Sequence, residues 1–331
     1  MAQVPQAPLR EEISLGALQS PFTVPLGLVD DRLLASLDQA AGFFEPILPQ
    51  VSGGKRLRPL LVLMCAQGAG GALPPAATPV AASVELVHLA SLMHDDVIDG
   101  APERRGLPSA PAALGARRAV LAGDYLAAAA YQEIAAADLP EAGRLLSDAV
   151  VAMTLSEVTG TLTSGQLLSE RQYLDLIGGK TAALFAAAAE LGALVSEVGE
   201  ERQADFRAFG QALGMAFQVR DDLLDLYGDA GRLGKGVHRD LAAGLYTLPV
   251  IYAAQAPGGK VIEERLARLR ATTEGDGLVE EIAQLARELG GEERAHEAMR
   301  GYVEEARQAL PECPARPLLL DLVEYAASRG E

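Results

Sequence analysis

Two acidic clusters are the residues best suited to chemistry in this chain of 331 residues. Both have the form DDxxD, and their members are Asp95, Asp96 and Asp99 in the first and Asp221, Asp222 and Asp225 in the second. Because residues four apart share a face of a helix, each cluster presents a pair of carboxylates on one side. Carboxylates suit Mg²⁺, which keeps several waters and shares phosphate oxygens. One such cluster could be the solvated end of a helix, but the repetition favours a metal site.

Short basic segments beside glycines accompany the acidic motifs. They are GGKRLRP at 53–59, RRG at 104–106, GKT at 179–181 and GK at 234–235. The chain is otherwise acidic, with a net charge of −17, so these cations are local exceptions and not part of a basic face. Arginine offers phosphate a planar fork of donors, and lysine offers a point charge. Each segment alone could be a surface patch; together they predict a pocket for a diphosphate.

The order of these motifs resembles that of the trans-polyprenyl diphosphate synthases. The matching segments are GGKRLRP, ELVHLASLMHDDVID, RRG, LAGD, GGKTA, FQVRDDLLD, LGK and TLP, between Gly53 and Pro249. The resemblance implies a single large helical bundle with an active-site cavity between central helices, usually in a homodimer. It also implies a chain-elongating prenyltransferase that condenses isopentenyl diphosphate with an allylic diphosphate and releases diphosphate. Mg²⁺, with three ions in each active site, would assist the ionisation.

The resemblance also implies a role for each matching residue. The metal ligands would be Asp95, Asp99 and Asp221, supported by Asp96, Asp222 and Asp225. The allylic diphosphate would be held by Arg104, Lys180 and Lys235. Isopentenyl diphosphate would be held by Lys55, Arg58, His88 and Arg105, and Thr181 and Gln218 would line the pocket around the developing cation. His88 could instead be a core histidine, but it lies two helical turns before Asp95 on the same stripe, which favours a role.

Two positions depart from the family pattern. Leu245 stands where a lysine that contacts the allylic diphosphate is expected, and Pro111 stands where many relatives have a histidine. A charge-assisted hydrogen bond of this kind is worth about 1.5–3 kcal/mol. Neither position is a metal ligand, so the departures bear on efficiency more than on reaction type.

Small residues just before the first motif bear on product length. Ala90 and Ser91 precede Asp95 by five and four positions, where short-chain relatives usually have an aromatic residue. A prenyl chain that grows along this helix should therefore find the tunnel open, with Val87 and Tyr131 as the next candidates for its floor. The expected product is geranylgeranyl diphosphate or longer, up to heptaprenyl or octaprenyl diphosphate. The alternative is that Ala90 and Ser91 are small only for helix packing.

The elements that would position these residues are helices. Apolar residues make up 49% of the chain, and alternating β-branched stretches are absent, so an all-α fold is predicted. Residues 1–28 are expected to form an irregular N-terminal arm, and residues 29–331 one all-helical polyprenyl synthase domain. The proline-containing segment 100–115 is expected to be irregular. Helices are expected near 81–99, 117–137, 141–156, 171–176, 180–196, 201–226, 239–254, 260–272, 276–309 and 316–328.

Composition bears on the remaining function classes. The acidic balance argues against nucleic acid as a partner, and no apolar run reaches the roughly 18 residues of a membrane span. A cytoplasmic enzyme without stable membrane insertion is therefore expected. A non-catalytic or regulatory prenyl-diphosphate-binding subunit remains an alternative, supported only by Leu245. A class I terpene cyclase is a weaker one, because it would be expected to carry a single DDxxD motif and more aromatics than the 5% found here.

Overall fold

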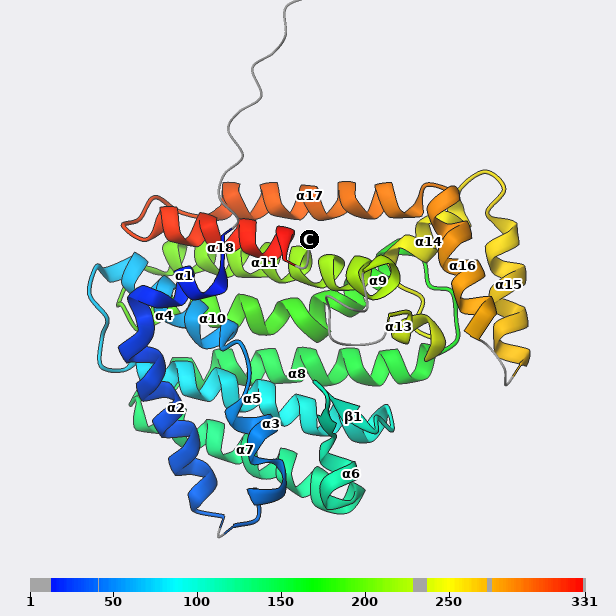
Figure 1. The fold of residues 1–331 in the computed structure, drawn as a ribbon. Coiled ribbons are helices and arrows are strands. Elements are labelled where there is room, and N and C mark those ends of the chain that lie inside the picture. The colour runs from blue at the N-terminus through cyan, green and yellow to red at the C-terminus, as the bar shows by residue number, and fades with distance from the viewer. Residues whose placement is uncertain (1–12, 41, 229–236, 273–275, 330–331) are drawn as a thin grey trace, which may run out of the picture.

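The computed structural model describes residues 13–40, 42–228, 237–272 and 276–329. This part of the chain is almost entirely helical (Figure 1), which confirms the predicted all-α class. The helices up to the first acidic motif are α1 (Leu15–Gln19), α2 (Thr23–Asp38), α3 (Leu48–Ser52), α4 (Leu57–Gly70) and α5 (Ala77–Ile98). Those up to the second motif are α6 (Ala110–Leu114), α7 (Ala116–Ala136), α8 (Pro140–Thr163), α9 (Glu170–Ile177), α10 (Ala183–Leu194) and α11 (Glu200–Tyr227). After it come α13 (Arg239–Ala242), α14 (Leu248–Gln255), α15 (Lys260–Ala271), α16 (Asp276–Glu288), α17 (Gly291–Ala309) and α18 (Arg316–Ser328).

The long helices form a layered bundle. Helices α5 and α7 pack against each other, α10 packs on both α4 and α11, and α17 covers the outer side of α11 (Figure 1). Glycines set the closest of these approaches. A Cβ at Gly210 of α11 would lie 2.5 Å from the backbone oxygen of Phe185, and one at Gly214 would lie 2.6 Å from the Cα of Ala182. These two glycines therefore let α11 approach α10 closely, just before the second acidic motif begins.

The N-terminal part of the described chain corrects the prediction of an irregular arm over residues 1–28. Residues 1–12 lie outside the described residues, but Leu15–Asp38 is helical apart from a 3₁₀ turn at Ser20–Phe22. Pro21 lies at the start of that turn and Pro25 in the first turn of α2, where the missing N–H costs nothing. The apolar residues point inward: Leu18, Phe22, Leu26, Val29 and Leu33 are buried.

Three other predicted segments differ from the structure. The expected helix 239–254 is interrupted between α13 and α14, and the expected helix 276–309 breaks between α16 and α17, where Gly290 adopts a φ of 78°. The segment 100–115 is not wholly irregular, because it contains α6 and a small antiparallel hairpin. Strand β1 (Glu103–Arg104) pairs with β2 (Leu107–Pro108), so that Arg104 lies opposite Leu107.

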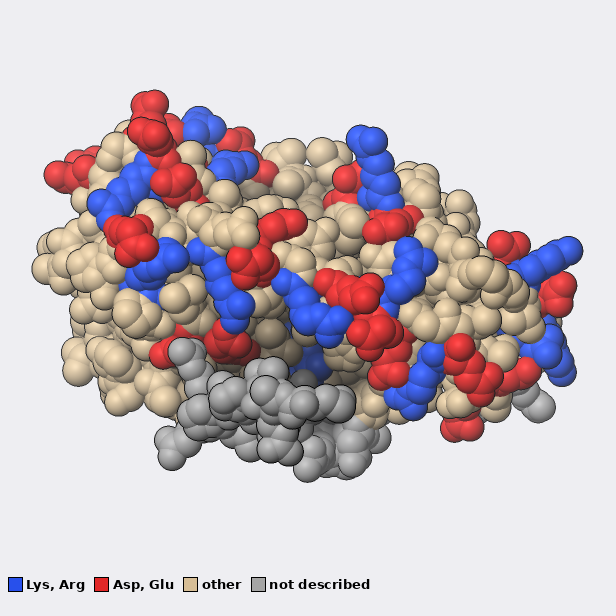
Figure 2. All heavy atoms as spheres, turned by 90° about the horizontal axis from the view of Figure 1, so that it is seen from above, with Lys and Arg blue, Asp and Glu red and all other residues tan. Residues whose placement is uncertain are grey.

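Two helical stretches are long and apolar enough to pass a test for membrane spans. The stretch Glu170–Leu194 is 67% buried inside the bundle, as expected of a core helix, whereas Pro140–Thr163 is only 17% buried. By length and composition α8 thus passes the test, although Asp148 and Glu157 interrupt its apolar residues, so that no uncharged run within α8 reaches the roughly 18 residues expected of a span. On the face seen in Figure 2, acidic and basic side chains are interspersed, and no broad area of one charge is visible.

Candidate active site

The two acidic motifs face one cavity of about 590 Å³. The first motif lies at the C-terminal end of α5, and the second lies on α11. Most of the residues predicted from the sequence line this cavity: Lys55, Arg58, His88, Asp95, Arg104, Arg105, Lys180, Thr181, Gln218 and Asp221. Asp96, Asp99, Asp222 and Asp225 do not line it, and Lys235 lies outside the described residues. The cavity therefore collects cations and carboxylates from segments far apart in the sequence.

In the first motif, Asp95 and Asp96 have different surroundings. Asp96 is fully buried and accepts hydrogen bonds from Arg104, at 2.7 Å to Nε and 2.6 Å to Nη2, so it positions that arginine. Asp95 faces the cavity, where burial raises its pKa to about 6 although nearby Lys180 lowers it. Burial also raises the pKa of Asp99, which is the C-cap residue of α5. A carboxylate that is costly to ionise is one that gains most from a bound cation.

The RRG segment forms the turn of the β1–β2 hairpin. Arg105 and Gly106 both have positive φ values, 53° and 74°, which is the requirement of a tight two-residue hairpin turn. This turn places Arg104 and Arg105 side by side at the cavity wall. Glycine at position 106 accepts this backbone conformation without strain.

In the second motif, Asp222 and Asp225 accept hydrogen bonds from other residues of the protein. Asp222 is buried and accepts hydrogen bonds from Tyr173 Oη at 2.7 Å and from Gln218 Nε2 at 2.9 Å. Burial raises its pKa to about 8, and these hydrogen bonds oppose the rise. Asp225 accepts the backbone N–H groups of Arg239 and Asp240 at the start of α13. Both carboxylates therefore fix neighbouring segments, while Asp221 points into the cavity.

Lys180 lies on a π-helical turn, Gly178–Ala182, that joins α9 to α10. A Cβ at Gly179 would lie 1.9 Å from Ser156 Oγ and 3.0 Å from the Ala152 carbonyl oxygen, so glycine lets this turn press against α8. Lys180 Nζ lies 2.7 Å from Glu157 of α8. Burial lowers the lysine pKa, but Asp95 and Glu157 outweigh that effect and the net pKa is raised, which keeps the ammonium charged.

A hydrogen-bonded chain links this turn to the second motif. Thr181 Oγ1 donates to Gln218 Oε1 at 2.6 Å, and Gln218 Nε2 donates in turn to Asp222. The amide orientation of Gln218 is thereby fixed, with its carbonyl oxygen beside the threonine hydroxyl at the cavity wall. Of the four residues in this hydrogen-bonded series, only Thr181 and Gln218 line the cavity, because Asp222 and Tyr173 lie behind them in the core.

The cationic side of the cavity is formed by Arg58, His88, Lys55 and Arg105. Arg58 stacks over the ring of Phe185 with its guanidinium carbon 4.7 Å from the ring centroid, and burial lowers its pKa to about 10. Its buried Nε has no hydrogen-bond partner within the described residues. The pKa of His88 is held well below its usual value, mainly by burial and next by the positive charge of Arg58, so His88 is neutral. The adjacent Arg56 is structural, with ion pairs to Asp30 at 2.7 Å and Glu85 at 2.9 Å.

The sequence reasoning missed two charged residues that pair with the predicted ones. Arg329, after α18, forms an ion pair with Asp221 at 2.8 Å and stacks on Phe217 at 3.6 Å. Glu157 of α8 pairs with Lys180. Neither belongs to a sequence motif, and both partners are brought together only by tertiary packing. An isolated arginine or glutamate outside a motif cannot be recognised as a site residue from the sequence.

A second cavity of about 260 Å³ adjoins the first. It contains the four residues assigned to product length, Val87, Ala90, Ser91 and Tyr131, together with Met153 and Thr154 of α8. Ser91, Asp95, Met153 and Lys180 line both cavities. An apolar channel between α5, α7 and α8 therefore begins at the first acidic motif and runs along α5 away from it.

The two departures from the family pattern lie away from the cavity of about 590 Å³. Leu245 packs, partly buried, against the apolar cluster that contains Leu223 and Leu248, and its N–H donates to the Asp240 carbonyl oxygen at 2.8 Å. Pro111 lies in the first turn of α6. Neither side chain lines the cavity in the described part of the chain.

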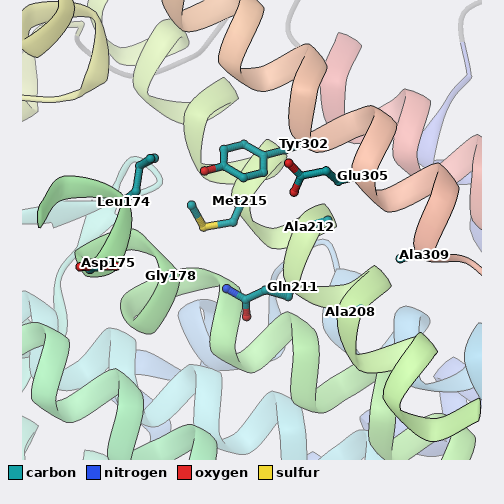
Figure 3. Close-up of a pocket in the computed structure, with 10 residues that line it drawn as sticks. All are labelled: Leu174, Asp175, Gly178, Ala208, Gln211, Ala212, Met215, Tyr302, Glu305 and Ala309. Atoms are coloured by element: carbon teal, nitrogen blue, oxygen red, sulfur yellow. The ribbon is translucent and has the colours of Figure 1, made fainter. Parts of the chain in front are cut away.

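A further groove of about 620 Å³ lies between α9, α11 and α17 (Figure 3). Tyr302 of α17 and Met215 of α11 face each other across it, with Asp175 and Glu305 at its sides. This groove shares no residue with the two cavities above. Although it is similar in volume to the first cavity, none of the motif aspartates lines it.

Comparisons with known proteins found relatives that match most of the chain. A model of the family described as polyprenyl synthetase matches residues 43–286. The nonaprenyl diphosphate synthase of Mycobacterium tuberculosis is 37% identical over 286 residues, 84% of each chain. Heptaprenyl diphosphate synthase component 2 of Geobacillus stearothermophilus is 35% identical over 96% of this chain and 99% of its own. The crystal structure of a polyprenyl synthase from Caulobacter crescentus CB15, complexed with calcium and isoprenyl diphosphate, matches with a TM-score of 0.86 at 32% identity, over 98% of this chain and 100% of that one.

Proposed function

Because the chain belongs to the polyprenyl synthetase family and is a chain-elongating trans-prenyltransferase, we propose how its residues act on isopentenyl diphosphate and an allylic diphosphate. The observation that carries the proposal is the shared cavity. Asp95 and Asp221 face it together with the cations of four separate segments, and the apolar channel leads out of it beside Asp95.

The proposed cofactor is Mg²⁺, with three ions in each site, held by Asp95, Asp99 and Asp221. Within the described residues, no three acidic, histidine or cysteine side chains lie together as a ready-made metal site. Asp95 and Asp221 offer carboxylate oxygens to the cavity, and such ligands fit a cation that completes its shell with water and substrate phosphate, as Mg²⁺ does. When bound, such ions stabilise the negative charge that develops on the departing diphosphate.

The residues near Lys180 are proposed to bind the allylic substrate. Arg104 and Lys180 hold its diphosphate, and Lys235, outside the described residues, is assigned the same role. The allylic C–O bond breaks and its electron pair leaves with the diphosphate. Thr181 Oγ1 and Gln218 Oε1 then lie near the carbocation, oriented by the hydrogen bond between them. Oriented oxygen dipoles of this kind stabilise positive charge at the reacting centre.

The opposite side of the cavity is proposed to bind isopentenyl diphosphate through Lys55, Arg58, His88 and Arg105. The unpartnered Nε of Arg58 supplies a donor for a phosphate oxygen, and neutral His88 donates or accepts one hydrogen bond. The double bond of this substrate attacks the allylic carbon, which forms the new C–C bond, and the released diphosphate accepts the proton that is lost. Positioning both substrates accounts for a large part of the rate.

The product is proposed to be geranylgeranyl diphosphate or longer, up to heptaprenyl or octaprenyl diphosphate. Ala90 and Ser91 leave the channel open near the first motif, and Tyr131 is the bulky residue further along it. The protein is proposed to act as a homodimer in the cytoplasm, with neither nucleic-acid binding nor stable membrane insertion. The apolar and mostly exposed α8 supports a protein partner on that helix.

The test is an assay of the purified chain alone with labelled isopentenyl diphosphate, farnesyl diphosphate and Mg²⁺. Linear prenyl diphosphates longer than the starter are expected, and a chelator should abolish their formation. Elongation that appears only after a second component is added would favour a non-catalytic or regulatory subunit. A cyclic hydrocarbon product would favour a terpene cyclase.

A further inference from the structure

Lys180 is attracted by two carboxylates but forms an ion pair with one of them. Its ammonium group donates to Glu157 Oε2 at 2.7 Å, and no ion pair joins it to Asp95 in the described part of the chain. Asp95 and Lys180 nevertheless line the same two cavities. After burial, which lowers the pKa of Lys180, the charge of Asp95 has the largest effect and raises it. The empty site therefore keeps apart two groups that attract each other.

Glu157 is held in place by α8, outside the diphosphate cavity. It lines the apolar channel of about 260 Å³ but not the cavity of about 590 Å³, and it is the only charged residue of α8 between Ala149 and Thr163. The preceding turn of α8 contacts Gly179 through Ser156 and the Ala152 carbonyl oxygen. The same helix therefore fixes both the backbone of the π-helical turn and the ammonium group that the turn carries.

We infer that Glu157 is a positioning residue that holds the ammonium group of Lys180 off Asp95 and Asp99 and so leaves these carboxylates free for metal. The inference rests on the proposed function, since it takes both aspartates as metal ligands and Lys180 as a group that binds the allylic diphosphate. An ammonium group has three N–H donors, so one can stay on Glu157 while another reaches a phosphate oxygen. Without Glu157, the strongest attraction left to Lys180 comes from Asp95, and a direct pair would compete with the metal.

A purely structural ion pair explains this contact less well. The side chains of Lys180 and Glu157 are 39% and 20% exposed, and partly exposed pairs add little to the stability of a fold. Helix α8 is already packed against α10 and the π-helical turn. A carboxylate on the wall of an apolar channel also costs desolvation, so its presence favours a role in the chemistry.

The first experiment measures metal binding without turnover. Glu157→Gln keeps the shape of the side chain and removes its charge. Glu103→Gln is the matched control, because it removes a carboxylate from the wall of the diphosphate cavity at an exposed residue that forms no ion pair with Lys180. Titration with Mn²⁺, followed by the electron paramagnetic resonance of the free ion at one fixed concentration of inorganic diphosphate, should show a dissociation constant raised about 10-fold or more in Glu157→Gln, since the metal must break a charge-assisted hydrogen bond. The control should bind Mn²⁺ as the unaltered chain does.

A double variant separates the positioning role from direct metal binding. Adding Lys180→Met to Glu157→Gln removes the competing ammonium group and should restore the affinity for Mn²⁺. An affinity that stays low would show that Glu157 is itself a metal ligand, which overturns the inference. A loss of the same size in Glu103→Gln would also overturn it, because the net charge of the site would then explain the effect.

Two crystal structures locate the ammonium group directly. In metal-free Glu157→Gln we expect Lys180 Nζ to donate to Asp95 or Asp99, and a lysine that stays away from both would overturn the inference. In the unaltered chain with Mg²⁺ and inorganic diphosphate, a structure that needs no variant, Nζ should contact both Glu157 and a diphosphate oxygen. Loss of the Glu157 contact there would count equally against the inference. If the unaltered chain elongates no substrate, the proposed function fails, whatever these structures show.

Discussion

Asp95 and Asp221 are the carboxylates on which the proposed chemistry depends most. Each faces the shared cavity, and each has a cation beside it, Lys180 near Asp95 and Arg329 at 2.8 Å from Asp221. A metal ion bound to Asp221 would have to displace Arg329, whereas a bound diphosphate could accept hydrogen bonds from it. In the resting site, each of these two carboxylates therefore already has a cation beside it.

Asp95→Ala and Asp221→Ala are each expected to lower turnover by about 100- to 1,000-fold or more, because each removes a ligand that stabilises the leaving group. The measurement is steady-state kinetics with Mg²⁺ supplied, with circular dichroism to show that the fold survives. Asp205→Ala, at an exposed position of α11, is the control and should be neutral. Near-normal activity in either motif variant would contradict the two-cluster mechanism.

The pKa of Asp95 predicts a dependence of metal binding on pH. Burial raises this pKa to about 6 in the metal-free site, so protonation competes with the metal as the pH falls through that value. The Mg²⁺ concentration for half-maximal rate should therefore be higher at about pH 5.5 than at about pH 8, where the carboxylate is already ionised. Mg²⁺ titrations of the rate at both values test this. An equal requirement at the two values would show that Asp95 is ionised throughout.

At the residue scale, the sequence predicted the groups that occur in motifs but not their counter-ions. The basic and acidic motif residues named from the sequence mostly line the cavity. Arg329 and Glu157 could not be found in the same way, because their importance comes from the packing of α18 on α11 and of α8 on the π-helical turn. No local spacing encodes either approach.

At the scale of elements, the π-helical turn Gly178–Ala182 is the part that most directly places a substrate-binding group. Gly179→Ala would force a methyl group into Ser156 and the Ala152 carbonyl oxygen. We expect a loss of stability of about 1–3 kcal/mol, as for other overpacked sites, and a lower kcat/KM for the allylic substrate because Lys180 is displaced. Thermal denaturation and kinetics measure the two effects.

Gly199→Ala is the matched control, because a Cβ there meets nothing within 4 Å and its φ is −62°. Adding Ser156→Gly to Gly179→Ala should recover part of both losses by removing the closest contact. If the double variant is no better than Gly179→Ala alone, the turn is not positioned by its contact with α8.

The long helices were predictable and their irregularities were not. Apolar periodicity located the helices that carry the two motifs, but a single π-helical turn of five residues is too short to be seen in that periodicity. The breaks at Gly290 and between α13 and α14 likewise fall inside continuous amphipathic patterns. The helix α1 and the first turns of α2, before Val29, were missed because prolines in first turns were taken as signs of an irregular arm.

At the scale of the whole molecule, the channel along α5 determines how long the product can become. Ala90→Phe, one turn before Asp95, is expected to fill the channel near its start and to limit the product to farnesyl diphosphate while catalysis continues. Chromatography of labelled products measures this, and Ala204→Phe at an exposed position of α11 is the control. A stable, active variant with an unchanged product would show that the tail does not pass Ala90.

The bundle architecture and its membership of a family followed from the motifs, since their order along the chain is specific. The extent of the apolar channel did not, because it depends on three helices whose lining residues are separated in sequence. The exposure of α8 was also missed, as a run of apolar residues shows how a helix is patterned but not which of its sides the rest of the chain leaves uncovered.

The contact between Arg329 and Asp221 has a consequence for biosynthesis. A nascent chain that has emerged only as far as α17 already contains both acidic motifs and the cations of the earlier segments. It still lacks the guanidinium that neutralises Asp221 and the helix, α18, that brings this group to α11. Asp221 therefore gains its counter-ion only after α18 and Arg329 have been translated and have docked on α11.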